Sequence, residues 1–174
     1  MTALRIGAGA LLAALVGVAV VFAAQPSPGA VQASSPLLGK KAPPLSGPYL
    51  AGAHLQASQL KGEWVVVNFF ASWCVDCRIE AAALDRFAAQ HPQGSGVQMV
   101  MVAYADPPQA AAGFLRLNGG WPAIEDPGGQ IALDWGVREP PETFVVAPDD
   151  RVVARFIGPV RASQLDSVLA GRVS

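Results

Sequence analysis

The chain has 174 residues, enough for one domain with a single sizeable hydrophobic core. Its 12 Lys and Arg almost balance its 13 Asp and Glu, giving a formal net charge of −1, and the basic residues are scattered. This distribution excludes the clustered basic footprint of a nucleic-acid-binding protein. Hydrophobic residues make up 52% of the chain, partly because of an uncharged run near the N-terminus.

Residues 1–24 are predicted to be an N-terminal transmembrane anchor or signal segment. The uncharged run 6–24, which follows Arg5, is long enough to cross a bilayer as a helix and longer than the usual apolar core of a signal peptide. We expect an uncleaved anchor with Arg5 on the cytoplasmic side. A cleaved signal is the alternative, because Val21–Ala23 and Val31–Ala33 both offer a cleavage-like pattern of small residues. Either way, the remainder is exported.

Residues 25–37 are predicted to be a flexible linker, because they are rich in Pro, Ser, Gly and Ala and lack a periodic apolar pattern. A single domain is expected over residues 38–174. It opens with an extended arm, Leu37–Leu45, in which the consecutive prolines Pro43 and Pro44 forbid a helix.

The apolar pattern of the domain then alternates between strand and helix periods. A short hairpin at Pro48–Leu55 and a helical turn at Ser58–Leu60 come first. Strands are predicted at Trp64–Phe70, Val97–Ala103, Trp121–Asp126, Glu142–Ala147 and Val152–Ile157, and helices at Val75–Gln90, Pro107–Leu117, Ile131–Trp135 and Ala162–Ala170. Strand, helix, strand implies a right-handed crossover and a parallel pair, whereas the last two strands form a hairpin. The prediction is an α/β domain with a mixed central sheet and helices on both faces.

The only two cysteines, Cys74 and Cys77, follow the strand at 64–70 and are separated by two residues. Cys74 is expected on the first turn of the helix, where open backbone N–H groups and the helix dipole favour a thiolate. Cys77, one turn further in, is expected to be shielded and to attack only a sulfur already bonded to Cys74. The pattern predicts a dithiol/disulfide redox centre.

The cysteine pair allows three other interpretations. A structural disulfide across two residues closes too small a loop to remove much unfolded-state entropy. A zinc site needs four ligands, and the two histidines, His54 and His91, lie singly in predicted loops. Two inert buried thiols remain as the third alternative, and the strand–helix context favours redox chemistry over it.

Glu80 lies on the same predicted helix face as Cys77 and the apolar residues Leu84 and Phe87, which are spaced three or four apart. Burial on this face would raise the pKa of the Glu80 carboxyl group, which could then exchange a proton with Cys77. The alternative is a helix glutamate that faces solvent.

Two segments resemble a known family. Phe69–Glu80 is similar to the active-site segment of thioredoxins, and Gly136–Phe144 resembles the second signature of the exported branch that includes DsbE/CcmG, ResA and TlpA. The resemblance covers about Leu38–Leu169. It implies a thioredoxin-like fold and a CxxC thiol:disulfide oxidoreductase, with no cofactor and no metal.

The same resemblance assigns a substrate-binding region. It places a cis-proline at Pro141, opposite the disulfide, where backbone can pair with a substrate strand; an ordinary trans turn is the alternative. Pro140, the preceding residue, has no N–H and offers only its carbonyl group. Glu142 matches an acid of the cytochrome-maturation subgroup and would place negative charge beside the thiol, unless it is a plain surface glutamate. Trp73 is expected to form an apolar rim for the docking peptide, with simple packing as its alternative.

The sequence departs from the family pattern at Pro140, where a residue with a backbone N–H is usual, and at two further places. Asn68 stands where thioredoxins carry a buried aspartate, which leaves Glu80 as the leading proton acceptor. The dipeptide Val75-Asp76 between the cysteines lacks the usual proline. The charge of Asp76 disfavours the Cys74 thiolate and would make the reduced protein a stronger reductant, whereas the helix N-terminus favours the thiolate and acts in the opposite direction.

The resemblance further implies protein disulfide substrates, namely apocytochrome c or its carrier, and a membrane electron donor of the CcdA/DsbD type. The protein would be a single-pass protein of the bacterial inner membrane with its catalytic domain on the periplasmic side. A redox-inert peptide-binding or chaperone module is one alternative function. A thiol peroxidase is another.

Overall fold

The computed structural model describes residues 17, 29–52 and 54–171. The predicted anchor or signal segment, residues 1–24, therefore lies outside the described residues except at one position. Within the described part of the chain, no helix combines the length and the apolar character needed to cross a membrane.

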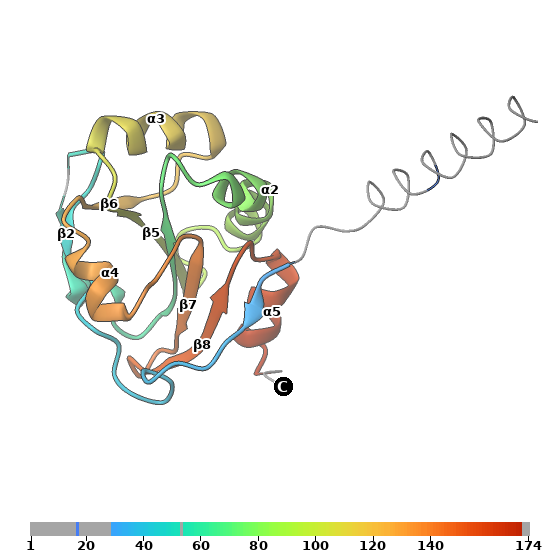
Figure 1. Ribbon diagram of the computed structural model, residues 1–174. Coiled ribbons are helices and arrows are strands. Elements are labelled where there is room, and N and C mark those ends of the chain that lie inside the picture. Colours follow the sequence, from blue (N-terminus) through green and yellow to red (C-terminus); the bar gives the residue numbers. More distant parts are fainter. Residues whose placement is uncertain (1–16, 18–28, 53, 172–174) are drawn as a thin grey trace, which may run out of the picture.

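A six-stranded mixed sheet forms the centre of the domain, in the order β1-β8-β7-β4-β5-β6 (Figure 1). β4, β5 and β6 are parallel, and β7, β8 and β1 continue the sheet with antiparallel pairing. The strands are β1 (Val31–Gln32), β4 (Trp64–Phe70), β5 (Val97–Tyr104), β6 (Ala123–Asp126), β7 (Glu142–Val146) and β8 (Val152–Ile157). β2 (Gly47–Pro48) and β3 (His54–Leu55) form a separate antiparallel ribbon. The predicted mixed sheet is confirmed.

Helices cover both faces of this sheet (Figure 1). α2 (Val75–Gln90), α3 (Pro108–Asn118) and α5 (Ala162–Leu169) contribute to one hydrophobic core, and α4 (Gln130–Trp135) and the 3-10 turn η1 (Ala57–Leu60) contribute to the other. β4 lies between the two cores and is therefore apolar on both faces, as buried parallel strands are. Its single polar residue, Asn68, is fully buried.

A short segment connects the carboxyl end of β4 to the start of α2. Val66 and Phe70 belong to the core under α2, whereas Val65, Val67 and Phe69 belong to the core on the opposite face. Because side chains alternate along a strand, Asn68 shares the α2 side with Val66 and Phe70. The segment between β4 and α2 contains Trp73 and Cys74, so the sheet fixes the position of the cysteine pair.

The prediction of a linker through residue 37 is wrong from residue 30 onward. Val31 pairs with Ile157 on β8, and the N–H of Ala30 donates to the carbonyl oxygen of Pro159 at 2.7 Å. The N–H of Ala33 donates to the Arg155 carbonyl oxygen at 2.9 Å. Both residues of β1 are exposed, so the strand has no alternating apolar pattern that a sequence could show. It is held by main-chain hydrogen bonds instead.

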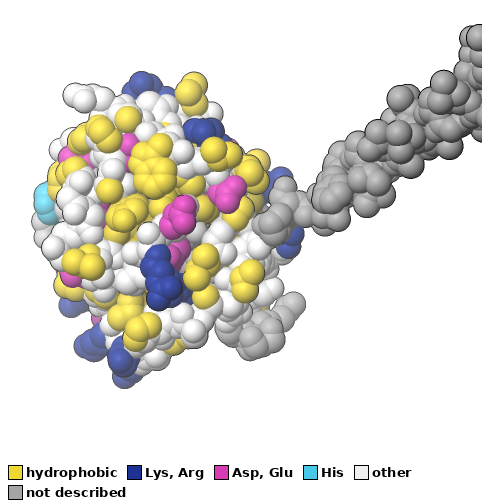
Figure 2. All heavy atoms as spheres, viewed as in Figure 1, with side chains coloured by type: hydrophobic (Ala, Val, Ile, Leu, Met, Phe, Trp, Pro, Cys, Tyr) yellow, Lys and Arg dark blue, Asp and Glu magenta, His cyan; other side chains and the backbone are white. Residues whose placement is uncertain are grey.

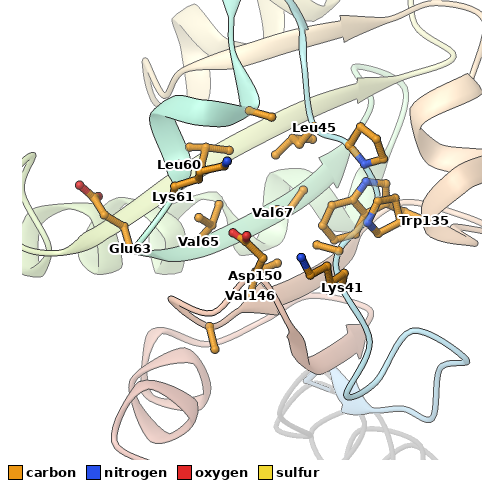
Figure 3. Close-up of a pocket in the computed structure, with 15 residues that line it drawn as sticks. Lys41, Leu45, Leu60, Lys61, Glu63, Val65, Val67, Trp135, Val146 and Asp150 are labelled. Carbon is orange, nitrogen blue, oxygen red and sulfur yellow. The ribbon is translucent and has the colours of Figure 1, made fainter.

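A hollow of about 170 Å³ opens beside the amino-terminal half of β4, away from the end that leads to the cysteines (Figure 3). Apolar side chains from β4, from the arm and from η1 surround it together with the Trp135 indole, and residues of the β7–β8 turn complete its wall. Neither cysteine lines it. This hollow is therefore separate from the cysteine site.

Candidate active site

Cys74 and Cys77 form a disulfide bond at the beginning of α2. Cys74 is the N-cap residue of the helix, and its Sγ accepts a hydrogen bond from the backbone N–H of Cys77 at 3.0 Å. Cys77 lies inside the first turn and is 2% exposed, and Cys74 is 5% exposed. The predicted placement of both cysteines is confirmed. The N–H of Cys77 and the dipole at the helix start would stabilise negative charge on this sulfur in the reduced protein.

Asp106 holds the segment that leads to Cys74. One carboxylate oxygen accepts the backbone N–H of Ser72 at 2.6 Å, and the other accepts the Ser72 hydroxyl at 2.9 Å. Asp106 itself is 2% exposed. It follows β5, the parallel neighbour of β4, and carboxyl ends of parallel strands lie at the same sheet edge. The sequence interpretation missed this residue, although its position after a buried strand was a usable signal.

The Pro140–Pro141 peptide bond is cis, as predicted from the family motif. The carbonyl oxygen of Pro140 lies 3.5 Å from the Sγ of Cys74. A disulfide sulfur has no proton, so this approach is a contact in the oxidised protein, and a Cys74 thiol at the same place could donate to the oxygen. The loop is fixed on its other side by the N–H of Gly158, which donates to the Pro141 carbonyl at 2.9 Å.

Glu80 is buried behind the cysteine pair, and its side chain is 2% exposed. One carboxylate oxygen accepts Nδ2–H of Asn68 at 2.8 Å, and the other accepts the backbone N–H of Val160 at 3.0 Å. Burial raises the pKa of the Glu80 carboxyl from 4.5 to about 7; the two hydrogen bonds oppose this shift and the charge of Asp76 adds to it. The prediction of a buried acid with a raised pKa is confirmed, and the solvent-facing alternative is wrong.

Asn68 connects this acid to the sheet. Its Nδ2 also donates to the hydroxyl oxygen of Thr143 on β7, at 3.0 Å, and both Asn68 and Thr143 are fully buried. In the sequence, Asn68 is notable only because thioredoxins carry a buried aspartate at this position. The structure makes it the side-chain partner of Glu80, a relationship between residues twelve positions apart that the motif does not reveal.

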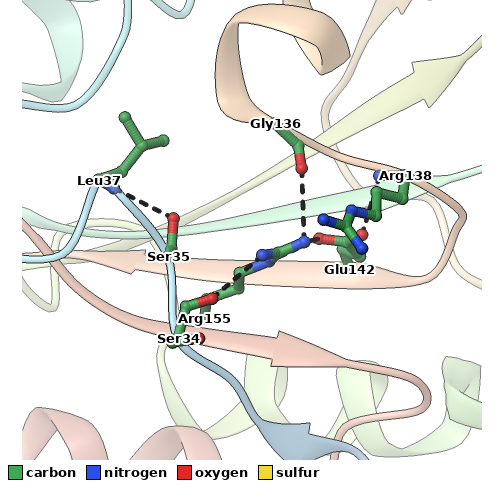
Figure 4. A network of polar contacts seen from close by, with 7 residues as sticks. All are labelled: Ser34, Ser35, Leu37, Gly136, Arg138, Glu142 and Arg155. Carbon is green, nitrogen blue, oxygen red and sulfur yellow. Dashed lines mark hydrogen bonds and ion pairs between the residues drawn. The ribbon is translucent and has the colours of Figure 1, made fainter.

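Glu142 carries a charge that is already paired. Its carboxylate contacts the Arg155 guanidinium at 2.7 Å and 2.8 Å and accepts the backbone N–H of Arg138 at 2.9 Å (Figure 4). Glu142 is 1% exposed, so the surface alternative is wrong as well. Since Thr143 is hydrogen-bonded to Asn68 on the α2 side of the sheet, the adjacent Glu142 points to the opposite face. The expectation that Glu142 places negative charge beside the thiol is therefore wrong.

Arg155 extends this ion pair into a wider network (Figure 4). Its guanidinium donates to the carbonyl oxygens of Ser34 at 3.2 Å and of Gly136 at 3.4 Å. The Arg155 side chain on β8 thus connects the segment directly after β1 to the loop that leads to Pro140. Sequence reasoning did not identify Arg155, because the register of the β7–β8 hairpin determines which residues meet.

Exposed apolar side chains surround the start of α2. Trp73 is 53% exposed, and Val75 and Ile79, one helical turn apart, are 63% and 52% exposed. Figure 2 shows a face on which hydrophobic side chains are interspersed with acidic and basic ones, with Lys and Arg in several separate places. Trp73, which directly precedes Cys74, is half-exposed, and its role as an apolar rim for a docking peptide stays a prediction.

The sequence matches the AhpC/TSA family over residues 38–155. It is 38% identical over 130 residues to a thiol:disulfide interchange protein DsbE homolog of Paracoccus denitrificans, covering 72% of this chain and 69% of that protein. It is 35% identical over 170 residues to the thiol:disulfide interchange protein HelX of Rhodobacter capsulatus, covering 92% of each.

The fold is similar to that of solved thioredoxin-like proteins. A DsbF homologue from Corynebacterium diphtheriae superposes with a TM-score of 0.67 at 25% identity, over 83% of this chain and 94% of that one. The sequence similarity, the fold and the CxxC disulfide all indicate the same family and the same activity. The chain belongs to the AhpC/TSA family and is a thioredoxin-like thiol:disulfide oxidoreductase.

Proposed function

We propose that this oxidoreductase is membrane-tethered and reduces disulfides of exported proteins, namely apocytochrome c or its carrier during cytochrome c maturation. The observation that carries the proposal is the Cys74–Cys77 disulfide at the start of α2 with the buried Glu80 carboxyl behind it. The resemblance of Gly136–Phe144 to the cytochrome-maturation subgroup supports the choice of substrate.

The reduced protein supplies two electrons in two exchange steps. The Cys74 thiolate attacks one sulfur of the substrate disulfide, so that a mixed disulfide forms and one substrate thiolate leaves. The Cys77 sulfur then attacks Cys74, the Cys74–Cys77 bond forms, and the second substrate thiolate leaves. Glu80 accepts the proton that Cys77 loses when it becomes the attacking thiolate.

The two cysteines have different tasks in this mechanism. The N–H of Cys77 donates to Cys74 Sγ at 3.0 Å, and this bond stabilises negative charge on the outer sulfur. Cys77 lies inside α2 and is 2% exposed, against 5% for Cys74 at the N-cap, so Cys77 is the more shielded sulfur and takes the resolving role in this mechanism.

Substrate docking would use the backbone of the cis-proline loop. The Pro140 carbonyl oxygen, 3.5 Å from Cys74 Sγ, can accept a backbone N–H from an extended substrate strand. Because Pro140 has no N–H, the pairing is one-sided. Trp73, Val75 and Ile79 supply apolar contact area around the same sulfur, and aromatic side chains are common anchors at such surfaces.

The cell-level part of the proposal follows from the N-terminal sequence and from redox balance. Residues 1–24 would anchor the protein in the bacterial inner membrane, with the catalytic domain on the periplasmic side. Each turnover leaves the Cys74–Cys77 disulfide oxidised, so a reductant is required. A membrane electron donor of the CcdA/DsbD type would supply the two electrons.

Trapping tests this proposal directly. The full chain with Cys77→Ala, expressed in a bacterium that makes c-type cytochromes, should accumulate mixed disulfides through Cys74, and mass spectrometry should identify apocytochrome c or its carrier. The double variant Cys74→Ser/Cys77→Ala is the matched control and should trap nothing. Adducts that contain only unrelated proteins would overturn the substrate assignment.

Two further assays address the alternative functions. A Cys74–Cys77 disulfide that no dithiol reduces would indicate the redox-inert peptide-binding module. Peroxide consumption that depends on Cys74 would indicate the thiol peroxidase. We expect ready reduction by dithiols and no peroxide turnover.

A further inference from the structure

The Asn68 carboxamide is buried with one of its two polar atoms unused. Nδ2 donates to both Glu80 and Thr143, while Oδ1 is buried and has no hydrogen-bond partner among the described residues. A buried polar atom without a partner destabilises the folded state, so such an arrangement calls for a physical reason. That reason lies in the neighbouring acid.

Glu80 needs opposite partners in its two protonation states. As a carboxylate it only accepts hydrogen bonds, and as a carboxylic acid it has an O–H to donate. A carboxamide carries donors on one side and an acceptor on the other, and rotation by about 180° exchanges them. The hydroxyl of Thr143 accepts from Nδ2 in the present orientation and can donate to Oδ1 in the rotated one.

The other groups around Glu80 cannot exchange a hydrogen-bond donor for an acceptor when Glu80 gains or loses its proton. The N–H of Val160 is a fixed main-chain donor. Asp76, one turn earlier on α2, is exposed and acts only through its charge. The Cys74–Cys77 disulfide does not titrate while it is oxidised, and the Glu142–Arg155 pair points to the opposite face of the sheet. Asn68 is thus the only side chain that hydrogen-bonds Glu80 within the described part of the chain.

We propose that Asn68 is the positioning residue for the proton on Glu80: its carboxamide donates Nδ2–H to the carboxylate and, after rotation, accepts the O–H of the acid at Oδ1. The inference rests on the proposed role of Glu80 as the acceptor of the Cys77 proton. As Cys77 loses its proton and bonds to Cys74, the proton passes to Glu80, and Asn68 turns from donor to acceptor. No electrons move through Asn68.

Substitution separates this role from simple packing. Asn68→Leu keeps the number and branching of the side-chain heavy atoms but removes both the donor and the acceptor. The hydrogen bond that Asn68 donates to the Glu80 carboxylate is charge-assisted, and it is stronger than the bond that Asn68 accepts from the Glu80 acid. Loss of both bonds should therefore raise the pKa of Glu80 by roughly one pH unit. Asn68→Asp should instead give two coupled titrations, because two adjacent carboxyls share protons. Thr143→Val, the matched control, leaves the 2.8 Å bond from Asn68 to Glu80 in place and should shift the titration much less.

The experiment follows Glu80 directly, by infrared titration of its carboxyl band in the oxidised full chain, with Glu80→Gln to assign the band. An upward shift in Asn68→Leu and a small one in Thr143→Val support the inference. An unchanged Glu80 titration in Asn68→Leu overturns it.

A second measurement needs no substitution in the Asn68 side chain. In the wild-type protein, the nuclear magnetic resonance signals of the Asn68 NH₂ group should change across the pH range in which Glu80 titrates, and signals that stay constant through that range overturn the inference even if Asn68→Leu does not fold. Failure of the proposed function would look different. In that case, Glu80→Gln would leave the rate and pH profile of mixed-disulfide resolution unchanged, whatever Asn68 does.

Discussion

Arg155 and Glu142 form a buried ion pair, 2.7 Å between Nη2 and Oε2, on the sheet face opposite Glu80. Removing one member leaves an uncompensated buried charge, which typically costs about 3–5 kcal/mol. We expect Glu142→Gln to reduce the free energy of unfolding by an amount in this range. Urea unfolding of the oxidised protein measures it.

The double variant Glu142→Gln/Arg155→Met is the control for this pair. Because it removes the stranded charge as well, its loss of stability should be well below the sum of the two single losses. Strictly additive losses would mean that the two side chains do not stabilise one another.

The stability of the oxidised protein should fall as pH rises, because Glu80 holds its proton more tightly when folded. Its pKa is about 7 in the folded chain against 4.5 for an unperturbed glutamate, so the folded state binds more protons between these values. The contribution is fully present below about pH 4.5 and is lost as pH rises through about 7, a total of about 3 kcal/mol. Urea unfolding at a series of pH values in wild type and Glu80→Gln tests this. Parallel pH profiles of the two proteins would contradict it.

Asp106 should matter for the reactivity of Cys74 and not only for stability. Asp106→Ala removes two hydrogen bonds that hold Ser72, so the segment before Cys74 loosens. Asp126→Ala is a matched control, because Asp126 is also buried and accepts the N–H groups of Ile131 and Ala132 at 3.1 and 2.9 Å, on α4. Both variants should lose about 1–3 kcal/mol of stability. Only Asp106→Ala should slow the reaction of reduced Cys74 with a disulfide, measured by stopped-flow fluorescence.

Trp73 should act on protein substrates alone. Since its side chain is 53% exposed, Trp73→Ala should change the free energy of unfolding by no more than about 0.5 kcal/mol. Loss of an aromatic anchor should lower kcat/KM for a protein disulfide roughly tenfold while leaving a small disulfide reagent unaffected. Leu133→Ala, at a 70% exposed position on α4, provides the comparison and should affect neither substrate. Equal losses for both kinds of substrate would show that Trp73 acts through the geometry of the disulfide instead.

Local sequence patterns were sufficient for most of the fold and for the cysteine pair. Both β4 and α2 were predicted with the bounds that the structure has, because the hydrophobic period changes between Phe70 and Val75 and the cysteines mark the junction. Glu80 was placed correctly by helical spacing alone. These signals lie within one or two elements, which a sequence displays directly.

The rest depended on which elements meet in space. The bonds of Asn68 to Glu80 and Thr143, and of Arg155 to Glu142, arise from strand register and from packing across the sheet, neither of which the hydrophobic pattern specifies. Glu142 was misassigned for this reason. An acid next to a motif was read as facing the thiol, whereas strand alternation turns it to the other side, towards a partner thirteen residues later.

The short β1 strand has one more consequence, for self-association. It covers the outer main chain of β8 at Phe156 and Ile157, while residues near Lys40 and Ala42 cover the beginning of β8. A truncated chain that begins at residue 38, where the family similarity begins, would leave the last residues of β8 as an open sheet edge with free N–H and C=O groups. Two such molecules could then join edge to edge, so we expect this two-residue strand, which has no core side chain of its own, to protect the edge of β8 against such pairing.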